Sequence, residues 1–160
     1  MIRVGHAWDT HKLVENRPLI LGGIEIPNSK LGLLGHSDAD VVLHAVAEAF
    51  LGSMALGDLG TFYPDNSEKT LGMDSKIILK ECYQKVLDRG YKLVNLDLTI
   101  YSEFIKISPV RIAIRDSIAS LLNTDVANVN VKATTYEKMS FIGRGEALAC
   151  ECVLLVEKEN

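Results

Sequence analysis

The sequence contains few cysteines, no excess of positive charge and no long apolar run. Its three cysteines are Cys82, Cys150 and Cys152, an odd number without a C-x-x-C pair, so a disulfide framework is not expected. We interpret them as small, buried, apolar residues of a protein in a reducing compartment. A redox or metal-binding pair formed by Cys150 and Cys152 is the alternative.

The charge balance implies no basic face. Lysine and arginine total 17 against 21 aspartates and glutamates, for a formal net charge of −4 at pH 7. Nucleic acid is therefore an unexpected partner. If the substrate is anionic, local cations, a metal or backbone amides must hold it.

Membrane spans and signal peptides are also unexpected. No apolar run approaches the roughly 18 residues that a membrane-spanning helix needs. The first ten residues, MIRVGHAWDT, lack the apolar core of a signal peptide. We expect a cytoplasmic protein of the bacterial kind, or a plastid-type organelle protein whose transit peptide is absent.

The length and the 48% hydrophobic content suit one compact domain over residues 1–160. Strands are predicted at 2–8, 19–21, 24–27, 93–101, 128–135 and 147–157. Helices are predicted from a cap at Ser37 or Asp38 to Gly52, over 74–89 with a stop at Gly90, and over 109–123. The glycine-rich stretch 57–66 is expected to be an exposed loop.

This mixed order predicts an α+β fold, with one mixed β-sheet and helices packed on one face. The other face of the sheet then needs a cover, which a second copy of the chain would provide. Two alternating sets are candidates for that contact: Leu96, Leu98 and Ile100, or Cys150, Cys152 and Leu154.

All four histidines, His6, His11, His36 and His44, lie within the first 44 residues. Asp9 and His11 stand two apart at a predicted strand end, so their side chains share one face. With His44 from a predicted helix, they form a set of three nitrogen and oxygen donors. Such a set leaves one coordination position open, as in a catalytic zinc site. The alternative is a chance D-x-H pair and an ordinary helical histidine.

Two polar groups flank His44 on its helix. Asp40 and Glu48 stand four residues before and after it, so either could orient its ring, or both could be solvated helix charges. His36 and Ser37 lie at the predicted helix entrance, where free N–H groups favour a phosphate. A plain helix cap would explain Ser37 but not His36.

A second polar stretch follows the strand predicted at 128–135. Thr134, Thr135 and Glu137 supply two hydroxyls and a carboxylate, which could bind a diphosphate and a hard cation. Residues 143–146 are predicted to form a tight turn that carries the guanidinium of Arg144. Each signal alone is weak, because turns are often polar.

Five ordered motifs together resemble a known family. They are D-x-H at 9–11, G-H-S-D-x-D-V-x-x-H-A at 35–45, A-L-G-D-x-G-x-x-(F/Y)-P-D at 55–65, V-N-V-K-A-T-T-x-E-K at 129–138 and G-R-G-E at 143–146. The chain closely resembles the 2-C-methyl-D-erythritol 2,4-cyclodiphosphate synthases of the non-mevalonate isoprenoid pathway. The resemblance extends over nearly the whole chain.

The resemblance implies a homotrimer in which each sheet faces the three-fold axis and the active sites lie between subunits. It implies a lyase that converts 4-diphosphocytidyl-2-C-methyl-D-erythritol 2-phosphate to the 2,4-cyclodiphosphate and CMP. It also implies one zinc ion per active site, and a magnesium or manganese ion that bridges the α- and β-phosphates.

The resemblance also implies roles for individual residues. The zinc ligands are Asp9, His11 and His44, and the catalytic residues are His36, Thr135 and Glu137. Substrate contacts are implied for Asp9, His36, Ser37, Asp58, Gly60, Tyr63, Pro64, Asp65, Lys106, Thr134, Thr135, Glu137, Phe141 and Arg144. Among these, Asp58 and Gly60 would contact the methylerythritol hydroxyls, and Glu137 would bind the second cation.

Two regions carry further implications. Segment 102–108 would line the cytosine pocket, although Ile105 stands where many members have proline. Phe141 and Arg144 match residues near a cavity on the three-fold axis, where some members bind an isoprenoid diphosphate. The competing interpretations are a zinc phosphohydrolase, a non-catalytic trimer that binds isoprenoid diphosphates, and an α+β domain with a buried histidine cluster.

Overall fold

A five-stranded mixed sheet forms the centre of the computed structural model, which describes residues 1–64 and 68–159. The strands run in the order β4-β1-β7-β5-β6. They are β1 (Ile2–Glu15), β4 (Leu31–Leu33), β5 (Tyr91–Tyr101), β6 (Val129–Thr134) and β7 (Ala147–Lys158). Only the pairing of β5 with β6 is parallel among these strands. A separate hairpin joins β2 (Ile20–Leu21) to β3 (Ile24–Glu25).

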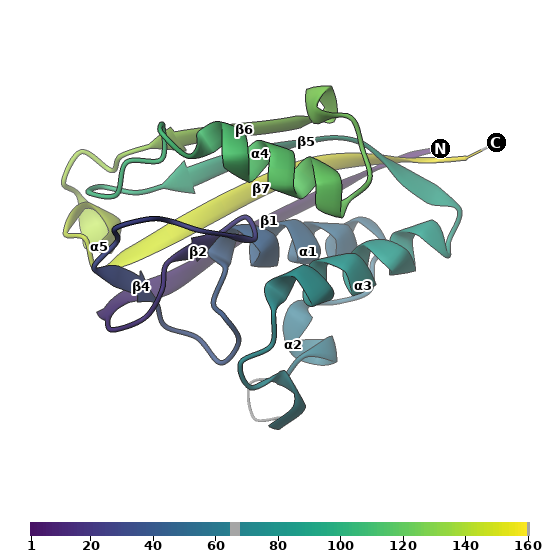
Figure 1. Ribbon diagram of the computed structural model, residues 1–160. Coiled ribbons are helices and arrows are strands. Elements are labelled where there is room, and N and C mark those ends of the chain that lie inside the picture. Colours follow the sequence, from purple (N-terminus) through teal and green to yellow (C-terminus); the bar gives the residue numbers. More distant parts are fainter. Residues whose placement is uncertain (65–67, 160) are drawn as a thin grey trace.

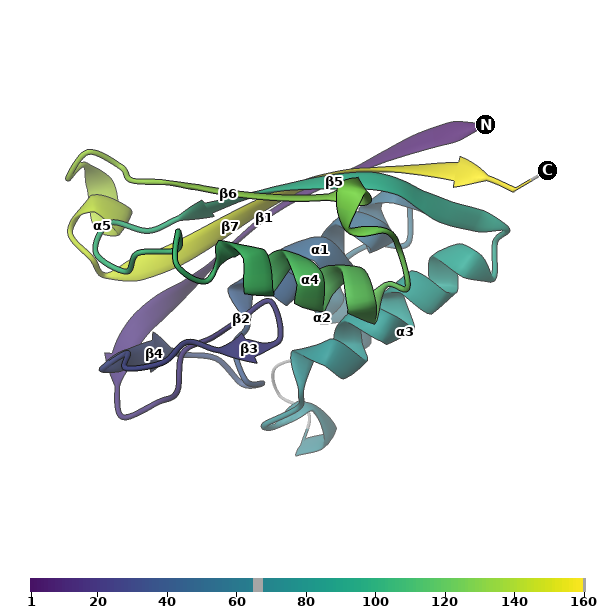
Figure 2. The same ribbon diagram turned by 45° about the horizontal axis from the view of Figure 1, so that its top comes forward.

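Three long helices cover one face of this sheet (Figure 1). They are α1 (Val41–Ser53), α3 (Ser75–Leu87) and α4 (Arg111–Leu121). The short elements are α2 (Leu59–Phe62), α5 (Ser140–Gly143), and the 3₁₀ helices η1 (Glu68–Thr70) and η2 (Val126–Asn128). Figure 2 shows α4 and α3 below the sheet and α5 beside the start of β7. The predicted α+β class and the placement of these helices are confirmed.

Helix α1 approaches the sheet closely where it crosses β1 at Gly5. A Cβ atom on Gly5 would stand 2.0 Å from the carbonyl oxygen of Ala49, so only glycine fits at this position. Helix α1 is rich in alanine and valine, and most of its residues are buried. The backbone of α1 therefore packs directly against the backbone of β1, the strand that carries Asp9 and His11.

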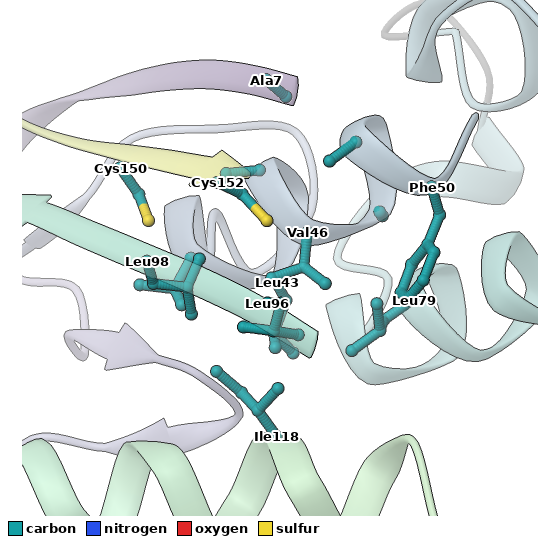
Figure 3. Packing of buried hydrophobic residues seen from close by; sticks show 14 of the residues in the cluster. Ala7, Leu43, Val46, Phe50, Leu79, Leu96, Leu98, Ile118, Cys150 and Cys152 are labelled. Atoms are coloured by element: carbon teal, nitrogen blue, oxygen red, sulfur yellow. The ribbon is translucent and has the colours of Figure 1, made fainter. Parts of the chain in front are cut away.

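The core lies between the sheet and the helices (Figure 3), where Leu96, Leu98, Cys150 and Cys152 face Leu43, Val46 and Ile118. The two alternating sets that were candidates for contact with a second copy are at most 1% exposed. That expectation is wrong, because alternation identifies two faces of a strand but does not say which face receives helices. The three cysteines are free and buried, as expected.

The opposite face of the sheet carries exposed apolar side chains. Ile2 is 66% exposed, Val4 61% and Val153 43%. On the same face Glu151 accepts hydrogen bonds from His6 Nε2 at 2.9 Å and from the hydroxyl of Tyr101 at 2.5 Å. Within the described part of the chain, no helix is long and apolar enough to cross a membrane.

Two element boundaries near the histidines differ from the prediction. Strand β1 continues to Glu15, so Asp9 and His11 lie within the strand and not at its end. Helix α1 begins at Val41 with Asp40 as its cap, and neither Ser37 nor Asp38 caps it. The sequence prediction missed β4, α2 and α5, which have three or four residues each and too few positions to show a period.

Asp40 fixes the start of α1. Its carboxylate is fully buried and accepts four backbone N–H groups. These come from Val42 at 3.1 Å and Leu43 at 3.0 Å in the helix, and from Gly22 at 2.9 Å and Gly23 at 2.6 Å in the hairpin turn. One carboxylate thus joins the hairpin to the helix that carries His44.

We expect Asp40→Asn to lower the free energy of unfolding by about 2–4 kcal/mol, because the amide nitrogen that replaces Oδ2 cannot accept the N–H of Gly23 and brings two donors face to face. Urea unfolding followed by circular dichroism measures the change. The matched control is Asp116→Asn on the exposed side of α4, for which we expect a change within about 0.5 kcal/mol. Equal effects of the two substitutions would contradict the role of Asp40.

Candidate metal centre

Asp9, His11 and His44 bring three donor atoms together. His11 Nε2 lies 3.1 Å from Asp9 Oδ2 and 3.1 Å from His44 Nδ1, and the Asp9 oxygen lies 3.4 Å from His44 Nδ1. Ligand atoms at about 2.0–2.1 Å from a tetrahedral zinc ion are about 3.3–3.4 Å apart. The cluster therefore has the spacing and the donor set of a three-ligand metal site.

The strand and the helix each set part of this geometry. Asp9 and His11 stand two apart in β1, so both side chains point toward the helices. His44 lies one turn into α1, which crosses β1 closely at Gly5. The predicted convergence of these three residues is therefore confirmed, although Asp9 and His11 come from the middle of the strand and not from its end.

Burial alone would raise the pKa of Asp9, but the imidazole rings of His11 and His44 beside its carboxylate hold that pKa well below its usual range. Burial opposes a charged His11, yet its hydrogen bond with the Asp9 carboxylate raises its pKa. The cluster thus contains an ionised carboxylate near neutral pH, which is the state that a metal ligand requires.

Hydrogen bonds on the outer side of each ring orient the two histidines. His11 Nδ1 donates to the carbonyl oxygen of Leu34 at 2.8 Å, which leaves the lone pair of Nε2 for the cluster. His44 Nε2 lies 2.9 Å from the hydroxyl of Ser75 and 3.2 Å from that of Ser37. Each histidine therefore has one nitrogen directed at the cluster and one held by the protein.

The partners proposed for His44 from helix spacing are not the ones in the structure. The four hydrogen bonds of Asp40 go to backbone N–H groups, and Glu48 Oε2 accepts from the backbone of Leu59 at 2.8 Å. The alternative of solvated charges is wrong for Asp40, which is fully buried. Spacing along α1 missed the real partner, because Ser75 belongs to α3.

A pocket of about 300 Å³ opens beside the cluster. Its lining comprises Trp8, Asp9, His11, His36, Ser37, His44, Glu48, Leu59, Gly60, Tyr63, Thr70 and Ile78. Seven of these were predicted as site residues. Of the other five, Glu48 was considered only as a partner of His44. The sequence analysis did not place Trp8, Leu59, Thr70 or Ile78 in the site, since none of them has a residue type that marks a known chemistry. The pocket walls come from β1, the loop before α1, α1, α2, η1 and α3, so the pocket forms only on folding.

The residues predicted to hold the methylerythritol part of the substrate lie partly in this pocket and partly outside its lining. Asp58 caps α2 and accepts from the backbone and the hydroxyl of Thr61, at 2.9 and 2.7 Å. Gly60 and Tyr63 line the pocket, and the hydroxyl of Tyr63 donates to Glu81 at 2.5 Å. Pro64 is exposed, and Asp65 lies outside the described residues.

A second group of predicted residues lies apart from this pocket. Among the described residues, its lining contains none of Lys106, Thr134, Thr135, Glu137, Phe141 and Arg144. These residues follow the ends of β5 and β6 or lie around α5 (Figure 1). The hydroxyl of Thr135 donates to Glu137 at 3.0 Å, and Arg144 is paired with Glu146 at 2.6 Å. The protomer thus presents two separate groups of candidate residues.

Glu103, which the sequence analysis did not single out, organises this second group. Its two carboxylate oxygens accept the backbone N–H groups of Tyr136 at 3.0 Å and Lys138 at 3.2 Å. Glu137 and Lys138 both have positive φ, of 51° and 61°. These bonds join segment 102–108 to the turn that carries Glu137, as expected if both contact one ligand.

Comparisons with known proteins agree with this geometry. The family described as the YgbB family matches residues 2–157. The curated 2-C-methyl-D-erythritol 2,4-cyclodiphosphate synthase of Carboxydothermus hydrogenoformans is 52% identical over 99% of this chain and 96% of its own length. Such a match along both chains extends beyond the metal cluster.

Solved structures give the same result. The bifunctional IspDF protein of Campylobacter jejuni superposes with a TM-score of 0.95 at 38% identity over all of this chain, which spans only 43% of that longer protein. The IspF protein of Plasmodium falciparum, solved as a CDP complex, gives 0.87 at 31% identity over 99% of this chain and 97% of its own. The chain therefore belongs to the YgbB family, with curated 2-C-methyl-D-erythritol 2,4-cyclodiphosphate synthases among its relatives.

Proposed function

We propose that this protein is a metal-dependent 2-C-methyl-D-erythritol 2,4-cyclodiphosphate synthase that acts as a single domain. It would convert 4-diphosphocytidyl-2-C-methyl-D-erythritol 2-phosphate to the cyclic 2,4-diphosphate and CMP. The observation that carries this proposal is the convergence of Asp9 Oδ2, His11 Nε2 and His44 Nδ1 beside a pocket in a chain of this family.

The donor set favours zinc. One carboxylate oxygen and two imidazole nitrogens at tetrahedral spacing suit zinc better than magnesium, which prefers six oxygen ligands. When bound, zinc would supply positive charge that neutralises and aligns a phosphate oxygen. A magnesium or manganese ion is proposed at Glu137, where carboxylate and hydroxyl oxygens of the second group are exposed.

The reaction needs alignment more than it needs a base. In the proposed step an oxygen of the 2-phosphate attacks the β-phosphorus, the bond to the bridging oxygen breaks, and CMP leaves with that electron pair. The attacking oxygen is already anionic, so no proton has to be removed. Ser37, His44 and Asp9 do stand in line in the pocket, with Ser37 Oγ 3.2 Å from His44 Nε2 and His44 Nδ1 3.4 Å from Asp9. In the proposed site His44 and Asp9 would hold the metal, so the pair would not act as the base for a serine nucleophile.

The proposed task of the chain is to hold both reacting groups. His36 and Ser37 face the pocket beside the metal cluster, where they would hold the 2-phosphate end of the substrate. Asp58 and the backbone at Gly60 would bind the methylerythritol hydroxyls, with Tyr63 nearby. Ideal alignment of two such groups contributes up to about 7–11 kcal/mol to lowering the barrier.

A homotrimer with active sites between subunits accounts for the separation of the two groups. The metal pocket of one protomer would meet Thr134, Thr135, Glu137 and Lys106 of its neighbour. The exposed apolar residues on the open face of the sheet support such an assembly. An isoprenoid diphosphate near Phe141 is a further proposal, although it would have to compete with Glu146 for Arg144.

The proposed reaction predicts a defined product. We expect ³¹P NMR of the protein with the cytidyl diphosphate substrate, Zn²⁺ and Mg²⁺ to show CMP together with a cyclic diphosphate. Linear phosphate products instead would identify a phosphohydrolase. Asp9→Asn should lower turnover by about 100-fold or more, because it removes a metal ligand. Asp116→Asn on α4 is the matched control and should leave turnover unchanged.

Zinc binding also predicts a change in stability. A chelator should lower the melting temperature of the wild-type protein, and zinc at 100 times its dissociation constant should restore about 2.7 kcal/mol of stability. His44→Ala should be insensitive to both treatments, because it lacks one nitrogen ligand. A chelator-sensitive His44→Ala variant would show that the stabilising metal lies elsewhere.

The division of the site between subunits predicts complementation. His44→Ala disables the metal pocket and Glu137→Gln disables the second group, so each homotrimer should be inactive. In trimers reassembled at random from equal amounts, about a quarter of the interfaces would pair an intact pocket with an intact Glu137. We therefore expect about a quarter of wild-type turnover after mixing. Confirmed mixed trimers without activity would show that both groups act within one protomer.

A further inference from the structure

Ser75 is a fully buried polar residue behind the metal cluster, and neither the motifs nor the pocket lining includes it. It is the first residue of α3, and its hydroxyl lies 2.9 Å from His44 Nε2. The same hydroxyl bonds Asp38 Oδ1, while the other oxygen of Asp38 accepts the backbone N–H of Ser75 at 3.1 Å. Ser75 therefore stands between a ring nitrogen and a carboxylate.

The direction of these hydrogen bonds follows from the chemistry of the groups. An ionised carboxylate only accepts hydrogen bonds, so the hydroxyl proton of Ser75 goes to Asp38. The oxygen of Ser75 then has only lone pairs left for His44, and Nε2 must carry the ring proton. In this tautomer the lone pair of His44 lies on Nδ1, which faces Asp9 and His11.

We propose that Ser75 is a positioning residue that, together with Asp38, fixes the tautomer and the ring orientation of His44 for metal binding. The inference rests on the metal site of the proposed function but not on the reaction carried out there. Outer hydrogen bonds of this kind typically change metal affinity by 10- to 100-fold.

Ser37 is the competing partner of His44, but it fits this role less well. Its hydroxyl lies farther from Nε2, at 3.2 Å, and accepts the backbone N–H of Ala39 at 3.1 Å. It also lines the pocket, so it faces the space in which a substrate would lie. Ser75 is enclosed and bonded to a carboxylate, so its hydroxyl has one defined orientation.

The same contacts connect the metal cluster to the packing of the two helices. Asp38 accepts from the backbone of Asp40 at 3.2 Å, just before α1, and from Ser75 at the start of α3. His44 is thus held from a second helix, which its own sequence neighbourhood does not reveal. We infer that the start of α3 contributes to metal affinity without touching the metal.

The first test measures zinc affinity by competition with a chromogenic chelator, using the full chain. Ser75→Ala should weaken zinc binding by about 10- to 100-fold. Ser53→Ala is the matched control, because Ser53 is also buried, lies on α1 and donates its hydroxyl to the carbonyl of Phe50 at 2.7 Å. It should change zinc affinity by less than about twofold. Equal affinities of Ser75→Ala and wild type would overturn the inference.

The second test reads the tautomer directly. Histidine ¹⁵N NMR of the metal-free wild type at pH 8 should show His44 protonated on Nε2, and Ser75→Ala should show a mixture of the two neutral tautomers. A loss of packing alone would not change which nitrogen of His44 carries the proton. The wild-type spectrum decides the question even if Ser75→Ala does not fold, because protonation on Nδ1 would overturn the inference.

The two proposals fail in different ways. Zinc binding that depends on Ser75 but yields no cyclic product would leave this inference standing and overturn the proposed function. If the enzyme forms the cyclic product but Ser75→Ala leaves its zinc affinity unchanged, only this inference is overturned. A wild-type protein that binds no zinc would overturn both.

Discussion

The packing of α1 onto β1 is the contact on which the candidate site depends. Gly5 allows the helix backbone to approach until a Cβ atom would stand 2.0 Å from the carbonyl oxygen of Ala49. This approach places His44 opposite Asp9 and His11, with donor atoms 3.1–3.4 Å apart. A larger residue at Gly5 would separate helix and strand, and three ligands from two elements would no longer converge.

Electrostatics explain how an acidic chain could bind an anionic substrate. The formal charge of −4 gives no general attraction for phosphates. The cluster nevertheless concentrates one ionised carboxylate and two imidazoles at a partly buried point, where a dication would be held strongly. Attraction at that point depends on the cation and not on net charge, and in solution it would be less sensitive to salt than a basic surface.

The sequence predicted the fold class, the three long helices and the metal triad. Each of these has a residue period or spacing that can be recognised without knowledge of the tertiary structure. Asp9 and His11 share a face by strand alternation, and α1 and α3 show helical spacing. The sequence failed where a second element decides the outcome. Leu96, Leu98 and Ile100 alternate clearly, yet only the position of the helices makes their face the interior.

Outer contacts of the site lie beyond pattern analysis for the same reason. Asp40 and Glu48 stand at helical spacing from His44 but accept backbone N–H groups instead, Asp40 from the β2–β3 turn and the start of α1, and Glu48 from the start of α2. Ser75, 31 residues away in sequence, supplies the hydroxyl that His44 meets. A single serine at the start of a helix resembles any other, so its role appears only when α3 is packed beside α1. A metal site of this kind depends on two sets of residues. The ligands belong to recognisable sequence motifs, whereas the residues that orient the ligands belong to none.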